Sequence, residues 1–198
     1  MNNISVRNST FIPLKFINNE SEFISFNGFF LDKEHLAIRI GKWSEQHIPL
    51  VRIHSECITG DVFHSLLCDC GEQLNESLKE IDIHGGVLIY LRQEGRGIGL
   101  YNKIDAYKLQ RNGLDTYQAN QALGFLDDYR DFSLAAKMLL AMNISKIRLI
   151  TNNPDKIHQL TQNGIEIYEV INTKTFLNEK NKNYLTAKKI KTSHALEL

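Results

Sequence analysis

The sequence lacks a surplus of either charge, a long apolar run and any cysteine outside one short window. Its 198 residues contain 23 Lys and Arg against 23 Asp and Glu. With no net charge there is no overall field that attracts nucleic acid or an anionic membrane, so we expect neither as a partner. Any anionic ligand must then be held by a local cluster of residues.

Hydropathy also argues against a membrane protein. The most apolar helical stretch, residues 134–142, is short and interrupted by Lys137, and the polar opening residues lack the apolar core of a secretory signal. We therefore expect a cytoplasmic protein, whose 42% apolar content suffices for a real core.

Hydrophobic periodicity predicts a mixed α/β fold: N-terminal strands, then alternating helices and strands. Short runs rich in Ile, Val and Phe predict strands over 22–26, 35–40 and 48–54, and a further apolar run predicts one at 87–91. Helical spacing predicts helices over 70–84, 98–112 and 131–142.

The clearest local unit is a βαβ pattern in residues 146–170. A strand is followed by Asn153 and Pro154 as helix cap and first helical residue, a helix ended by Gly164, and a second strand. Such units bind ligands beyond the carboxyl end of the first strand. We expect one catalytic domain over 1–177 and a basic, mobile tail over 178–198; a tail that folds over a phosphate site is the alternative.

The three cysteines, Cys57, Cys68 and Cys70, indicate a metal site. In a reducing compartment grouped cysteines are more typical of metal ligands or catalytic thiols than of disulfides. Catalytic zinc commonly has three protein ligands and one water, and three cysteines fit that open arrangement, provided that the backbone turns within "CDCG". Two alternatives stay open: a closed site with His54 or His64 as fourth ligand, and three inert buried thiols.

Several uncommon strings occur together and in order. They are "RIHSECITGDVFHSLLCDCGEQL", "YLRQEGRGIGLYNKIDAYKLQ", "GLDTYQANQALGF", "DDYRDF" and "RLITNNPDK". Together they make the chain resemble the GTP cyclohydrolase II family over residues 48–171. The resemblance weakens at both ends, where Leu14 and Ser193 stand at positions at which the family usually has threonine and glycine.

The resemblance implies a homodimeric hydrolase of riboflavin biosynthesis. It would convert GTP and water into formate, pyrophosphate and 2,5-diamino-6-hydroxy-4-(5-phosphoribosylamino)pyrimidine. It implies one catalytic Zn²⁺ per chain on Cys57, Cys68 and Cys70, and Mg²⁺ with the triphosphate. The residues implied to contact GTP are Arg52, Ile53, His54, Ser55, Glu56, Gln73, Glu94, Gly95, Arg96, Thr116, Thr151 and Lys156.

The resemblance also implies three catalytic residues. Asp128 matches a proton acceptor, Arg130 a nucleophile toward the α phosphorus, and Tyr107 a tyrosine needed for formate release. A guanidinium with a pKa above about 12 is a poor nucleophile. Arg130 is therefore also interpreted as stabilising phosphoryl charge, with Asp128 orienting it or a water molecule.

Taken singly, these residues have simpler interpretations. "EGRGIGL" is also typical of a glycine-rich turn, Lys156 of a solvated lysine at a helix start, and "DDYRDF" of an acidic turn before a helix that begins at Asp131. Two other functions stay open as well. One is an enzyme that stops at a formamidopyrimidine or at pyrophosphate release, and the other is a non-catalytic, zinc-stabilised binding domain.

Overall fold

The computed structural model describes residues 3–30, 33–42, 47–126, 128–182 and 185–186. These residues divide into two compact units. The sheet unit contains the described residues within 1–54, 75–92 and 132–173, and the cysteine unit those within 55–74, 93–131 and 174–198. Each unit is described by itself.

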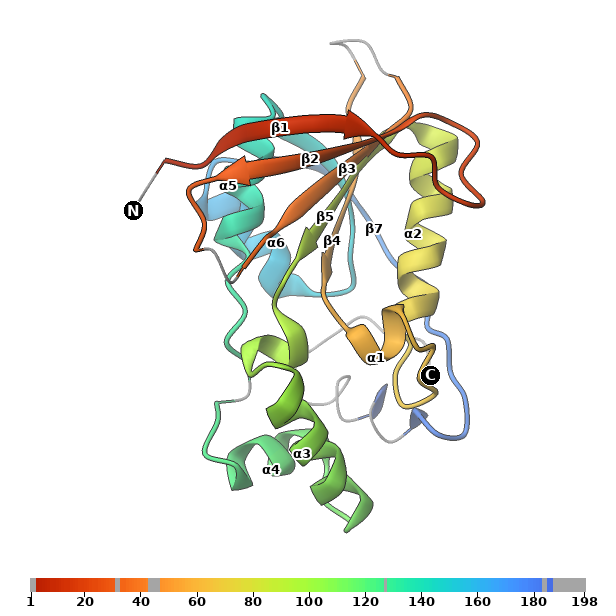
Figure 1. Cartoon of the computed structure of the whole chain (residues 1–198), viewed down its shortest axis with the longest axis vertical. Coiled ribbons are helices and arrows are strands. Elements are labelled where there is room, and N and C mark those ends of the chain that lie inside the picture. The colour runs from red at the N-terminus through yellow and green to blue at the C-terminus, as the bar shows by residue number, and fades with distance from the viewer. Residues whose placement is uncertain (1–2, 31–32, 43–46, 127, 183–184, 187–198) are drawn as a thin grey trace. The chain divides into compact units, whose positions relative to one another are not determined.

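A seven-stranded sheet of order β1-β2-β3-β5-β4-β6-β7 forms the sheet unit (Figure 1). β1 pairs antiparallel with β2, β2 with β3, and β3 with β5, whereas β4, β6 and β7 pair in parallel. The strands are Ser5–Phe11, Ser21–Asn27, Leu36–Ile40, Leu50–Ser55, Gly86–Leu91, Lys146–Ile150 and Glu166–Ile171 for β1 to β7. The mixed α/β fold class is confirmed.

The predicted βαβ unit is present as β6, α6 (Pro154–Gln162) and β7. The Asn153 side chain caps α6 by accepting a hydrogen bond from the backbone N–H of Asp155, and Pro154 occupies the first helical turn. Gly164 follows the helix at a φ of +86°, a conformation that suits glycine. The capping residues therefore predicted both ends of α6 correctly.

Helix α5 (Ser133–Ala141) covers part of the sheet and lies next to α6 (Figure 1). Its Ala135, Ala136, Met138 and Leu139 are fully buried in the core with Val51, Ile53 and Ile89 of the sheet, among others. The predicted start at Asp131 is two residues early, because Phe132 is the N-cap and its buried ring belongs to the core.

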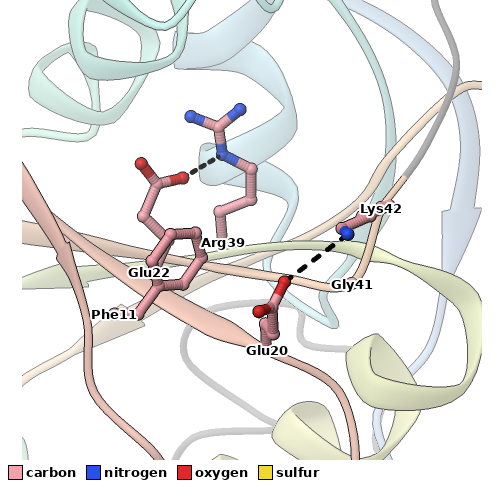
Figure 2. Close-up of a pocket in the computed structure, with 6 residues that line it drawn as sticks. All are labelled: Phe11, Glu20, Glu22, Arg39, Gly41 and Lys42. Atoms are coloured by element: carbon pink, nitrogen blue, oxygen red, sulfur yellow. Dashed lines mark ion pairs between the residues drawn. The ribbon is translucent and has the colours of Figure 1, made fainter.

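Strand β1 was missed by the sequence analysis. All seven of its residues are exposed, since it is an edge strand, and its sequence therefore carries no apolar alternation. On this part of the sheet Phe11, Glu20, Glu22, Arg39, Gly41 and Lys42 line a hollow of about 250 Å³ (Figure 2). The residues that line the hollow form two ion pairs, Arg39 with Glu22 at 2.8 Å and Lys42 with Glu20 at 3.7 Å.

The cysteine unit is built from short helices. They are α1 (Ile58–Asp61), the start of α2 (Cys70–His84), the 3₁₀ turn η1 (Glu94–Gly97), α3 (Leu100–Arg111) and α4 (Thr116–Ala122). α3 packs against η1 and α4. α4 was missed, although Asp115 and Gln118 form a capping box that marks its start.

The remaining predictions on the chain ends concern residues that the structure describes only in part. In the predicted tail, Asn181 is buried and its side chain accepts a hydrogen bond from the backbone N–H of Asn178 at 2.8 Å. Residues 187–198, including Ser193, lie outside the described residues. Within the described ranges, no helix combines the length and the apolar character that crossing a bilayer requires.

Candidate metal centre and nucleotide-binding residues

The three cysteines come together in the cysteine unit. Cys57 precedes α1, Cys70 opens α2, and all three sulfur atoms lie within 4.8 Å of one another as free thiols. The expected turn within "CDCG" is therefore the start of a helix. The prediction that the three cysteines form one cluster is confirmed.

The spacing of the sulfur atoms fits zinc. The Sγ atoms of Cys57 and Cys68 are 3.7 Å apart. Thiolates that bind Zn²⁺ tetrahedrally at about 2.3 Å lie about 3.8 Å from each other. Among the described residues, no histidine or carboxylate joins the three sulfurs as a fourth ligand. The arrangement therefore favours the open site over the closed one.

Among the described residues, the ligand atoms that gather with the three sulfurs include neither histidine of the closed alternative. His54 belongs to β4 in the sheet unit, where its ring stacks on Tyr90 at 5.5 Å between centroids. His64 follows α1 in a left-handed backbone conformation with a φ of +52°. The alternative of inert cysteines is also disfavoured, because Cys57 contacts a buried ammonium group.

Gly60 fixes the space between the cysteines and was not predicted. A Cβ atom at this position would lie 2.9 Å from Cys68 Sγ, 3.1 Å from Cys57 Sγ and 3.1 Å from Cys70 Cβ. Gly71 packs equally tightly, since a Cβ there would overlap the carbonyl oxygen of Gly60. The sequence contained a signal for this packing, because one glycine follows Cys57 closely and another follows Cys70 directly. Glycines at these positions allow the segment that contains Cys57 and the segment that contains Cys70 to lie close together.

A buried polar network surrounds Cys57. Lys103 of α3 donates to Cys57 Sγ at 3.1 Å, to Thr59 Oγ1 at 3.0 Å and to Glu94 Oε1 at 2.8 Å. Glu94 Oε2 also accepts from the backbone N–H of Ile58 at 2.6 Å. Glu94 was predicted, whereas Lys103 and Thr59 were missed. Lys103 lies one helical turn before Tyr107, and that spacing was the available signal.

The three thiols have different pKa values. The pKa of Cys57 is strongly lowered, because hydrogen bonds from Cys68 and Cys70 and the charge of Lys103 outweigh its burial. Its hydrogen bond to Cys57 raises the pKa of Cys68 to about 12, and the same interaction together with burial raises that of Cys70. Because cysteine binds Zn²⁺ as a thiolate, metal binding at this cluster must release protons.

Tyr107 lies in the same network. The Lys103 ammonium, which also contacts Thr59 Oγ1 and Cys57 Sγ, is 5.6 Å from the centre of its ring. Burial raises the pKa of Tyr107, so its hydroxyl keeps its proton near neutral pH and can donate or accept a hydrogen bond.

Asp128 and Arg130 form a bidentate ion pair. Arg130 Nε donates to both carboxylate oxygens, at 2.9 and 3.0 Å, and Nη2 donates to Oδ2. Burial alone would raise the pKa of Asp128, but hydrogen bonds and charge from Arg130, with a contribution from Arg96, lower it. Such an arrangement holds the guanidinium in its charged form.

Arg96 occupies a strained position next to this pair. Its φ is +61°, its guanidinium lies 4.4 Å from the ring centre of Tyr117, and its carbonyl accepts a hydrogen bond from the backbone N–H of Tyr129 at 2.9 Å. Left-handed non-glycine residues of this kind cluster at functional sites. "EGRG" is thus a turn whose residues also join the polar network.

The other predicted GTP contacts of the cysteine unit lie at its helix starts. Gln73, in the first turn of α2, donates its Nε2 to the buried Asp69 Oδ2 at 2.7 Å, a contact that the sequence analysis missed. Thr116 is the first residue of α4, and Gly95 belongs to η1. Ser55 and Glu56, both partly buried, directly precede Cys57.

The remaining predicted contacts belong to the sheet unit and gather at the carboxyl ends of β4 and β6. Arg52 Nη1 donates to the carbonyl of Ile150 at 3.2 Å. Lys156 Nζ donates to the carbonyl of Ile53 at 2.7 Å. Thr151 Oγ1 accepts from the backbone N–H of Asn153 at 3.0 Å. Lys156 is only 6% exposed, so its interpretation as a solvated lysine is wrong.

The fold and the cluster together define a mixed α/β protein whose three cysteines can hold a metal with one tetrahedral position left over. The sequence model of one family, GTP cyclohydrolase II, matches residues 7–172. The match begins well before residue 48, so it includes the atypical N-terminal segment.

Relatives match over nearly the whole chain. A GTP cyclohydrolase-2 of Psychromonas ingrahamii is 58% identical over 177 residues, which are 89% of this chain and 88% of that protein. One of Vibrio parahaemolyticus is 57% identical over 182 residues, covering 91% and 92%. One of Hahella chejuensis is 51% identical over 165 residues, covering 83% and 80%. The chain belongs to the GTP cyclohydrolase II family.

Proposed function

We propose that the protein opens the imidazole ring of GTP, releases formate and pyrophosphate, and so supplies the pyrimidine that begins riboflavin biosynthesis. Membership of the family supports the activity. The observation that carries the proposal is the cysteine cluster, with sulfur atoms spaced for tetrahedral zinc and no fourth protein ligand among the described residues.

Zinc would be held by Cys57, Cys68 and Cys70 and would supply Lewis acidity and an activated water molecule at carbon 8 of guanine. Removal of carbon 8 as formate requires two hydrolytic attacks on a poor electrophile. Tyr107 would serve the second attack, and this role is supported by Lys103, whose ammonium contacts Cys57 Sγ and lies 5.6 Å from the centre of the Tyr107 ring. Glu94, held by three donors, would orient the guanine amine.

Cleavage between the α and β phosphates is the second task. Charge on the leaving pyrophosphate must be neutralised, and we propose Mg²⁺ and Arg130 for this role. The bidentate pairing with Asp128 supports an electrostatic role for Arg130 rather than a nucleophilic one, because a paired guanidinium stays protonated. Asp128 would orient Arg130 or accept a proton from water.

We propose the predicted residues as GTP contacts. In the cysteine unit they are Ser55, Glu56, Gln73, Glu94, Gly95, Arg96 and Thr116. In the sheet unit they are Arg52, Ile53, His54, Thr151 and Lys156, of which Arg52 and Lys156 are buried cations beside the helix start that follows β6. Helix starts of this kind favour anions.

We also propose a homodimer in the cytoplasm. The three free cysteines support a reducing compartment, and the family resemblance supports the dimer. Size-exclusion chromatography with light scattering measures the oligomeric state, and a monomeric mass at micromolar concentration would contradict the dimer.

The deciding experiment measures three quantities on purified protein incubated with GTP and Mg²⁺: formate by proton NMR, pyrophosphate by a coupled assay and bound zinc by atomic absorption. We expect one zinc per chain and equal amounts of formate and pyrophosphate. Formate is the sharper signal, since it is released only if ring opening goes to completion. A chain that holds one zinc and yields neither product would contradict the proposal.

Metal removal separates catalysis from a purely structural role of zinc. With a catalytic zinc, chelation leaves a folded, inactive chain whose activity returns with zinc, whereas a zinc-stabilised binding domain unfolds. Far-UV circular dichroism before and after chelation distinguishes the two outcomes.

A further inference from the structure

Lys103 is a buried lysine whose ammonium group contacts three different polar groups of the cysteine unit. It is 9% exposed, and its Nζ donates to Cys57 Sγ, Thr59 Oγ1 and Glu94 Oε1 at 3.1, 3.0 and 2.8 Å. An ammonium group has three donors. The contacts therefore account for its full hydrogen-bonding capacity.

The contacts place one cation between two buried anions. Glu94 is 7% exposed and pairs with Lys103 Nζ at 2.8 Å, and Cys57, which would bind a metal as a thiolate, is 5% exposed. Since both groups lie within hydrogen-bond distance of one ammonium, their negative charges are close neighbours and would repel each other without it. The cost of burying the ammonium group is offset by these two partners, the Glu94 carboxylate at 2.8 Å and the Cys57 sulfur at 3.1 Å.

The charge on Cys57 also affects the metal. Three thiolates give a zinc site a net negative charge, and electron donation from sulfur weakens the metal as a Lewis acid. A hydrogen bond from an ammonium group withdraws electron density from the thiolate that accepts it. Groups that contact metal ligands tune the metal in this way.

We propose that Lys103 is a positioning residue of this centre: it fixes the Glu94 carboxylate beside the cysteine cluster and weakens electron donation from Cys57 to the bound metal. The kinetic consequence rests on the proposed GTP hydrolysis. The electronic consequence requires only that Cys57 binds the metal.

The test uses the full chain with Co²⁺ in place of Zn²⁺, because cobalt shows a sulfur-to-metal charge-transfer band in the near ultraviolet. Lys103→Met removes the donor and the charge at similar volume, and Lys103→Arg keeps both. Lys108→Met is the matched control, since Lys108 is an exposed lysine of the same helix.

We expect the band of Lys103→Met to move to longer wavelength, because a thiolate without its hydrogen bond gives up electrons more easily. Lys103→Arg should return the band toward the wild-type position, and Lys108→Met should leave it unchanged. With zinc bound, kcat/KM for formate release should fall about 10- to 100-fold in Lys103→Met, the usual effect of losing a partner of a metal ligand. A loss of folding alone does not predict the band shift.

An unshifted band in cobalt-loaded Lys103→Met would overturn the proposal. If that variant does not fold, Lys103→Leu, which also has no donor and no charge, is measured in the same way, and an unshifted band there has the same meaning. A wild-type rate of formate release in Lys103→Met would overturn the positioning role while leaving the proposed activity intact. If the wild-type chain releases no formate, the proposed activity fails, and the band shift still decides whether Lys103 acts on Cys57.

Discussion

Adding one methyl group at Gly60 tests whether the cysteine cluster has the dimensions of a zinc site. The Cβ of Gly60→Ala would lie 2.9 Å from Cys68 Sγ and 3.1 Å from Cys57 Sγ. To reach ordinary contact at 3.4 Å, the Cys68 sulfur must move by about 0.5 Å. Zinc–sulfur distances tolerate only about 0.2 Å. The substitution should therefore disturb the metal site more than the fold.

The expected changes in free energy also indicate that Gly60→Ala affects the metal site more than the fold. Alanine in place of glycine within a helix gains up to about 1 kcal/mol, whereas overpacking costs about 1–3 kcal/mol. We expect a folded chain of somewhat lower stability. Displaced ligands should lower zinc affinity about 10- to 100-fold, which corresponds to about 1.4–2.8 kcal/mol.

Competition with a chromophoric chelator measures the zinc affinity, and thermal unfolding measures the stability. Gly113→Ala is the control, because its added methyl has no atom within 4 Å while its φ of +101° strains any side chain. It should lower stability and leave zinc affinity unchanged. Wild-type zinc affinity in Gly60→Ala would refute the argument from sulfur spacing.

Four further predictions concern other residues of the cysteine unit. Cys68→Ser should abolish formate release and weaken zinc binding while the far-UV circular dichroism stays native; retained activity would remove Cys68 from the mechanism. Asp69→Ala should raise the KM for GTP about tenfold or more, because the 2.7 Å bond that holds Gln73 Nε2 is lost; an unchanged KM would show that Gln73 needs no such support. Arg130→Ala should slow pyrophosphate release and raise the pKa of Asp128 in a carboxyl NMR titration, whereas Arg130→Lys should retain part of the rate if the role is electrostatic. The folded-state pKa of Asp128 is lowered, so the ion pair stabilises the fold above about pH 4 and this stabilisation is lost as the pH falls further. Asp128→Asn should therefore be less stable than wild type at pH 7, and the difference in the free energy of unfolding should become smaller at pH 3. An equal deficit at pH 3 and pH 7 would contradict this linkage.

Local sequence signals were sufficient where the structure depends on neighbouring residues. The βαβ unit was predictable because Asn153, Pro154 and Gly164 set the ends of α6 through their own backbone preferences. Strand β1 was not predictable in this way, because an edge strand with every residue exposed has no apolar alternation. Pairing with β2, and not its own sequence pattern, makes it a strand.

The metal ligands also show which features depend on the local sequence and which depend on the tertiary structure. Ligand count and compartment were enough to predict a metal site on the three cysteines, with an open coordination position favoured and a closed site left as an alternative. The sequence by itself did not exclude His64 as a fourth ligand, because its distance in space depends on how the chain turns after α1. The tertiary structure favours the open site, because the group of possible ligand atoms among the described residues consists of the three sulfurs.

The sequence by itself determined which residue types carry the chemistry and the order in which they occur. The tertiary structure decided how these residues contact one another, as with Lys103 and Cys57, which are 46 positions apart. It also decided that Gly60 lies against all three cysteines. Contacts of this kind depend on the packing of separate segments, and packing leaves no periodic pattern in the residues that make them.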